Sequence, residues 1–229
     1  MRVFVDANIL YMKTIRDWLF AFSTCKDIKA FDLFSSNDVL VEAMYHIRRS
    51  NPTISGKKIN AILEQMAEIV ELVDDFDCEA ALPAYKGSDE NDLHLHAAAC
   101  DSHSDVLLTN DRKLYKRLSD EELDELPYSV YTADDFFCLL AESPVLLDQA
   151  VSCELDYWSH RCEDGVDLRG PLVKAECPNF AYLVERALKR KSGLSPINID
   201  ELLPLDERYS AALRVNSRND LAVITDDFC

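Results

Sequence analysis

The sequence predicts an α/β protein with a central parallel β-sheet and a small α-helical C-terminal appendage. Strand patterns over residues 2–6, 105–109 and 128–131 alternate with amphipathic helical patterns. After Pro144 the pattern is helical, with no further strong strand. Strands that alternate with helices are typical of a parallel sheet covered on both faces. The C-terminal ends of such strands meet at one edge, where functional sites collect.

The N-terminal elements are one buried strand and three helices. The β-branched and aromatic residues of the segment 2–6 stop abruptly at Asp6, which predicts a short strand. Apolar residues recur at helical spacing between Ile15 and Phe22. A second helix is expected to begin at Ser36, a favourable N-cap residue. The third helix is predicted from apolar spacing over residues 59–73.

The following elements bring the sheet to completion. Residues 74–88 are expected to form the connection between the third helix and the next one, and to contain two short strands. A helix is predicted from Ser88 or Asp89 through Ala99, and its run of alanines suits close packing on a sheet. Two strand patterns follow, and a helix capped at Thr132 comes after the second. We therefore divide the chain into an α/β domain at 1–141, a helical appendage at 142–192 and an acidic tail at 193–229, for which disorder is the alternative to loose docking.

Composition narrows the classes of function. The 229 residues carry a net charge of −18 and only 5 glycines, and neither glycine-rich nucleotide-binding motif occurs. Such an acidic surface repels nucleic acid unless divalent cations or a local basic strip intervene. The 8 cysteines form no C-x-x-C pair, and no signal peptide or membrane span is visible. We therefore expect a reduced, cytoplasmic protein without a membrane partner.

Four acidic residues stand where a site at the sheet edge would need them. Asp6 ends the first strand, Glu42 lies in the second helix, Asp92 begins the alanine-rich helix and Asp111 follows the strand at 105–109. Converging carboxylates repel unless cations lie between them, and oxygen ligands suit Mg²⁺ or Mn²⁺. Two such ions about 4 Å apart can promote hydrolysis of a phosphodiester. Any single Asp at a helix start is more often a cap than a ligand, so the set carries the hypothesis.

Four segments resemble, in order, the motifs of PIN domains, the fold of VapC-like toxin ribonucleases. The resemblance covers roughly residues 1–140, and the helical extension resembles a longer bacterial subgroup. The matching segments are Val3-Phe4-Val5-Asp6-Ala7-Asn8-Ile9-Leu10, Ser36-Asn37-Asp38-Val39-Leu40-Val41-Glu42, Asp89-Glu90-Asn91-Asp92-Leu93-His94 with Ala97-Ala98-Ala99, and Leu107-Leu108-Thr109-Asn110-Asp111.

The resemblance implies a PIN-like three-layer fold and a metal-dependent endoribonuclease, the toxin of a toxin–antitoxin pair. It carries over Asp6, Glu42, Asp92 and Asp111 as catalytic metal ligands, with Asp89 as a fifth candidate carboxylate. RNA is then the substrate, Mg²⁺ or Mn²⁺ the cofactor, and an antitoxin and a homodimer are candidate partners. Glu90 departs from the subgroup, which often has Pro there.

Neighbouring residues suggest supporting roles. Asn8 and Thr109 are expected to orient a carboxylate, a ligand or a water. Tyr11 could stack on a base or pack in the core. Basic residues could contact phosphates or form ordinary solvated helix faces. They are Arg112, Lys113, Lys116 and Arg117 after the last acid, and Arg48, Arg49, Lys57 and Lys58 between the second and third helices.

Two other functions are left open. A catalytically inactive PIN-like binding module would act through its acidic surface and would show no metal-dependent cleavage. A phosphatase-type hydrolase with an Asp nucleophile usually needs a second Asp two residues on, where this chain has Asn8. The complete acidic set argues against the binding module, and Asn8 together with the lack of a suitable Lys-bearing motif argues against the phosphatase.

Overall fold

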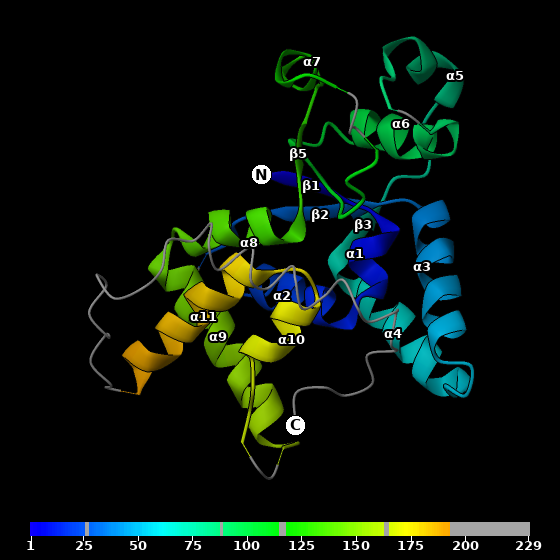
Figure 1. Ribbon diagram of the computed structural model, residues 1–229. Coiled ribbons are helices and arrows are strands. Elements are labelled where there is room, and N and C mark those ends of the chain that lie inside the picture. The colour runs from blue at the N-terminus through cyan, green and yellow to red at the C-terminus, as the bar shows by residue number, and fades with distance from the viewer. Residues whose placement is uncertain (26–27, 88, 115–117, 163–164, 193–229) are drawn as a thin grey trace. The chain divides into compact units, whose positions relative to one another are not determined.

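The computed structural model describes residues 1–25, 28–87, 89–114, 118–162 and 165–192. Its central feature is a sheet of five parallel strands in the order β3-β2-β1-β4-β5 (Figure 1). The strands are β1 (Arg2–Val5), β2 (Asp32–Ser35), β3 (Val70–Leu72), β4 (Val106–Leu108) and β5 (Ser129–Tyr131). The expected α/β class with a parallel sheet is confirmed.

The order of the strands creates a switch point between β1 and β4. The chain runs outward from β1 through β2 to β3, and then returns to the other side of β1 to form β4 and β5. Val5 pairs with Leu108, so Asp6 and Thr109 are the next residues at this edge. Ligands of open α/β sheets bind beyond the strand ends at such a point.

The chain forms two units, and all the strands belong to the first (residues 1–12 and 29–133). Right-handed crossovers place the helices before β3 on one face of the sheet and those after it on the other, as Figure 1 shows for α4 and α6. The first group is α1 (Ala7–Tyr11), α3 (Asn37–Ser50) and α4 (Gly56–Ile69). The second is α5 (Cys78–Ala81), η1 (Leu82–Ala84), η2 (Glu90–Asp92), α6 (Leu93–Asp101) and α7 (Asp120–Asp124).

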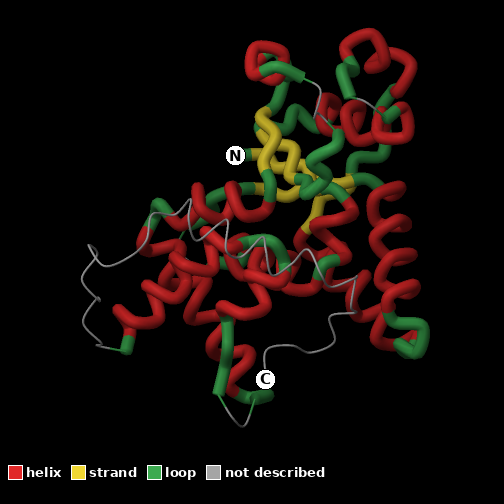
Figure 2. Tube along the Cα trace, viewed as in Figure 1, coloured by secondary structure: helices red, strands yellow, loops and turns green. Residues whose placement is uncertain are grey.

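In its described residues, the second unit (residues 13–28 and 134–229) consists of helices and the loops between them, without a strand (Figure 2). Its core is an aromatic cluster in which the rings of Trp18 and Phe180 meet edge to face at 4.9 Å, and Phe137 lies 5.0 Å from Phe180. Asp134 accepts hydrogen bonds from the backbone N–H groups of Asn179 and Phe180 at the start of α11. The helices are α2 (Lys13–Ser23), α8 (Ala133–Ala141), α9 (Pro144–Ser159), α10 (Arg169–Lys174) and α11 (Pro178–Lys191).

Most predicted elements are found close to their expected positions. Ser36 caps α3 by accepting from the backbone N–H of Val39, and the stripe between Ile15 and Phe22 lies on α2. The alanine-rich helix is α6, preceded by the 3-10 turn η2. The strands expected at 105–109 and 128–131 are β4 and β5, and helices follow Pro144 as predicted.

Two expectations about local structure were wrong, and one strand was not predicted. The third helix ends at Ile69, and residues 70–72 form β3, because pairing with β2 overrides the continued helical spacing. The strand β2 was not foreseen, since its apolar run is only two residues long. Residues 74–88 contain α5 and η1 rather than two strands, because Asp77 caps a helix there by accepting from Glu79 and Ala80.

Each of the two units is made of segments that are separate in the sequence. The segment 13–28 groups with the C-terminal helices, although it lies between β1 and β2 in the sequence. The division into domains at 1–141 and 142–192 stays a prediction, and the tail at 193–229 lies outside the described residues. Among the residues that are described, no single helix is long and apolar enough to cross a membrane, and only α8 and α9 together, separated by a bend of 116°, meet that criterion.

Candidate active site at the sheet edge

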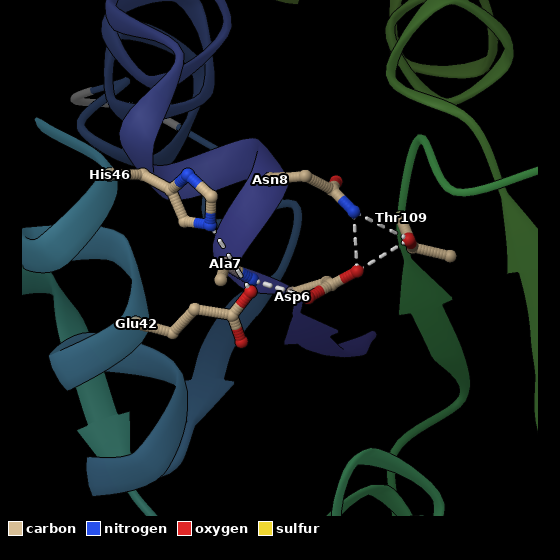
Figure 3. A network of polar contacts seen from close by, with 6 residues as sticks. All are labelled: Asp6, Ala7, Asn8, Glu42, His46 and Thr109. Carbon is tan, nitrogen blue, oxygen red and sulfur yellow. Dashed lines mark hydrogen bonds and ion pairs between the residues drawn. The ribbon is translucent and has the colours of Figure 1, made fainter. Parts of the chain in front are cut away.

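Asp6 occupies the end of β1 and caps α1. Its backbone N–H donates to Leu108 O at 3.1 Å, which extends the sheet ladder by one residue. Its Oδ1 accepts from the backbone N–H of Ala7, and its Oδ2 accepts from Asn8 Nδ2 at 2.5 Å and Thr109 Oγ1 at 2.6 Å (Figure 3). A buried carboxylate at a helix start is therefore fixed by three donors.

The hydroxyl of Thr109 connects the two strands that flank the switch point. It donates to Asp6 and accepts from Asn8 Nδ2 at 3.0 Å and from the backbone N–H of Asp111 at 3.0 Å. Asn8 in turn accepts from the backbone N–H of Asn110 at 2.9 Å. The orienting roles predicted for Asn8 and Thr109 fit these contacts.

Asn110 is a structural residue that the sequence reasoning missed. Its Oδ1 accepts from the backbone N–H of Ala133 at 2.9 Å, which joins the end of β4 to the start of α8. The signal was its place between Thr109 and Asp111 in a turn, where a short amide side chain readily bonds backbone groups.

Glu42 approaches the site from α3. Figure 3 shows its side chain extending from the helix toward the end of β1. One carboxylate oxygen lies 3.6 Å from His46 Nε2, one helical turn further on, and half of the Glu42 side chain is exposed. Its negative charge raises the pKa of Asp6, so the two carboxylates are electrostatic neighbours.

Asp92 lies half-buried at the junction of η2 and α6, where its side chain makes no capping hydrogen bond. Its pKa is raised to about 6, mainly by burial and then by the negative charges of Asp89, Asp6 and Asp111. Asp89 is engaged differently, because its Oδ1 accepts from the backbone and side-chain nitrogens of Asn91. Asp89 thus acts on Asp92 through its charge while it caps the turn.

Asp111 is exposed just beyond β4, and its Oδ1 accepts from the backbone N–H of Lys113 at 2.8 Å. Arg112 and Lys113 are likewise exposed beside it. Lys116 and Arg117 lie outside the described residues. The charges of Asp6, Glu42 and Asp111 all raise the pKa of Tyr11, after the larger effect of burial. The effects on the pKa values of Asp6, Tyr11 and Asp92 therefore connect all four predicted acids electrostatically.

His94 is a second residue whose position the sequence reasoning did not foresee. Its Nδ1 donates to Asn91 O at 2.7 Å, while its Nε2 is buried without a hydrogen-bond partner. Its charge lowers the pKa of both Asp6 and Asp92. His96 points elsewhere and bonds Tyr128 Oη at 2.7 Å in the core, as expected for residues two apart on a helix.

The donor set fits a hard divalent cation in its chemistry. Carboxylate oxygens are the ligands that Mg²⁺ and Mn²⁺ prefer, and mutual repulsion is the cost that a cation would relieve. Within the described residues, however, no three His, Cys, Asp or Glu side chains are grouped closely enough to hold a metal ion. Binding would therefore require side chains to turn, as the half-exposed Glu42 can.

Comparisons with known proteins do not assign this chain to a family. No family model, no curated protein and no solved structure matches the chain.

Proposed function

We propose that this protein is a metal-dependent endoribonuclease with a PIN-like fold. One observation carries the proposal: Asp6, Glu42, Asp92 and Asp111 come from four elements, and their charges act on one another at the C-terminal edge of a parallel sheet. The ordered motifs that resemble PIN domains support it. Mg²⁺ or Mn²⁺ is the proposed cofactor, and RNA the proposed substrate.

Each part of the site has a proposed task. Asp6 and Asp111 hold one cation, while Glu42 and Asp92 complete the site or position a second. A bound cation would supply charge neutralisation and an acidified water. Thr109 and Asn8 keep the Asp6 carboxylate oriented through the bonds described above. Arg112 and Lys113, exposed beside Asp111, are proposed to contact RNA phosphates.

The biological setting follows only from the resemblance. A toxin of this class is paired with an antitoxin that blocks its site, and we extend that arrangement to this chain as a proposal. A homodimer and a cytoplasmic location belong to the same proposal.

The first prediction is that cleavage depends on the carboxylates and on the metal. The full chain should cut total RNA in Mg²⁺ or Mn²⁺, and excess chelator should stop it. Asp92→Asn and Glu42→Gln should lower the rate at least about 100-fold, since each replaces a proposed anionic ligand by a neutral amide. Asp6→Asn should abolish cleavage. The rate is measured from product bands on denaturing gels.

The exposed Asp101 at the end of α6 provides the matched control, and Asp101→Asn should cleave like the wild type. Circular dichroism checks that each variant is folded, which matters most for Asp6 because of its three donors. Full activity in folded Asp6→Asn, or in chelator, would refute the mechanism. Absence of cleavage by the wild type with either metal would instead favour the inactive binding module.

A further inference from the structure

An aromatic ladder, made of Tyr11, His46 and Tyr45, runs from the carboxylates onto the surface of α3. The rings of Tyr11 and His46 are stacked, with centroids 4.7 Å apart and planes at 27°. Tyr45 meets His46 nearly at right angles, at 5.5 Å and 80°. The three rings are in contact in series, which scattered surface aromatics would not be.

The inner end of this ladder adjoins the candidate active site. Tyr11 lies on α1, five residues after Asp6, and it responds to the charges of three of the four acids. His46 lies 3.6 Å from a carboxylate oxygen of Glu42. A group bound along the ladder would therefore be a direct neighbour of a phosphate held at the carboxylates.

The outer end of the ladder is open to solvent. Tyr45 is 59% exposed, so its ring is accessible to a bound molecule. Residues 42, 45, 46 and 49 share one face of α3, because they are spaced by three and four. Arg49 is exposed at the far end of that face, about 10 Å along the helix from Glu42 at 1.5 Å per residue.

We propose that the aromatic ladder binds single-stranded RNA, with a base next to the cleaved phosphate stacked on Tyr45 and the following phosphate at Arg49. A flat exposed ring accepts any base that is free of its own helix, whereas a paired base is already stacked. The order along α3, from acids to rings to a cation, matches the order of phosphate, base and phosphate in a strand. This inference rests on the proposed nuclease function and adds the surface and the residues that would hold a base of the substrate.

The test measures binding separately from cleavage. Full-length protein with Asp92→Asn, in Mg²⁺, is titrated into a ten-nucleotide single-stranded RNA that carries 2-aminopurine at one position, and the position is varied. Stacking on an aromatic ring is expected to quench this base at one register. Adding Tyr45→Ala should weaken binding about 5- to 100-fold and remove the quenching. Tyr45→Phe should retain both.

Two controls separate stacking from general effects. Tyr157→Ala removes an equally prominent tyrosine from α9, 45% exposed, and should change neither affinity nor quenching. The same RNA in a duplex should bind the protein with and without Tyr45→Ala equally. If Tyr45→Ala binds the single strand as tightly as its parent, the inference is overturned. That result is also the one expected if this face binds a protein partner and not RNA.

The two proposals can fail independently. Register-dependent quenching that needs Tyr45, in a protein whose wild type cuts no RNA, would retain the stacking site and end the nuclease proposal. If cleavage depends on metal but Tyr45→Ala changes neither cleavage nor affinity, the nuclease proposal is retained and the stacking site is rejected.

Discussion

At the scale of single residues, the site depends on the buried carboxylate of Asp6. Its hydrogen-bond donors offset only part of the effect of burial on its pKa. Asp6 is 6% exposed, and burial is the largest effect that raises its pKa. Its bonds to Thr109 and Ala7 act in the opposite direction. The Thr109 hydroxyl therefore stabilises a charge that the fold would otherwise disfavour.

We predict that Thr109→Val destabilises the protein by about 1.5–3 kcal/mol, the range for a hydrogen bond to a charged group. Valine keeps the shape but cannot donate to Asp6, and it leaves the Asp111 N–H without this acceptor. The measurement is the urea midpoint by circular dichroism. Thr109→Ser retains the hydroxyl and should lie closer to the wild type. Equal loss in both variants would assign the effect to packing.

At the scale of elements, α4 shows how far local pattern decides a helix. Ser55 caps it by accepting from the backbone N–H of Lys58 at 3.2 Å, yet Gly56 opens its first turn and Lys57 and Lys58 follow. Glycine and basic residues are both unfavourable at the start of a helix. The element therefore begins on its cap alone.

Gly56→Ala should stabilise the protein by about 0.5–1 kcal/mol, because alanine restricts the unfolded chain. A Cβ at Gly56 would meet nothing within 4 Å. The matched control is Gly165→Ala, where space is equally free but φ is +105°. That change should destabilise by about 1 kcal/mol or more through backbone strain. Thermal melting of the two variants decides the point, and shifts of the same sign would contradict it.

At the scale of the whole molecule, the sheet unit carries the proposed chemistry and the helical unit carries a buried acid of its own. Glu154 on α9 is 5% exposed and accepts from Trp158 Nε1 at 3.0 Å. Burial raises its pKa to about 7, and the charge of Asp17 adds to the effect. It is therefore protonated in the folded protein over a range in which the unfolded chain is ionised.

The sign of the pH dependence follows directly. Because the folded pKa lies above the ordinary 4.5, the stabilising contribution of Glu154 is complete below about pH 4.5 and is lost as the pH rises to about 7. The loss amounts to roughly 3 kcal/mol at most. Glu154→Gln should therefore gain stability over the wild type as the pH rises from 5 to 8.

Urea midpoints at pH 5 and pH 8 measure this difference. The exposed Glu142→Gln, in the turn before α9, should change with pH as the wild type does. A constant offset between Glu154→Gln and the wild type at both pH values would show that Glu154 does not titrate in this range.

The sequence by itself predicted the parallel α/β class and the Ser36 cap of α3, and it named four acidic residues as candidates for the site. These depend on local signals: β1 and β4 are short apolar runs that end at polar residues, and Ser36 is a cap followed by a helical stripe. Asp6 and Asp111 were candidates because they follow such strands.

Only the tertiary structure decided β2, β3, the place of α2 in the helical unit and the pairing of Asn110 with Ala133. The reason is physical. A three- or four-residue strand exists through hydrogen bonds to neighbours distant in the chain, and a side chain such as Asn110 finds its partner only when the fold brings separate segments together. Local periodicity in the sequence therefore does not predict these long-range contacts.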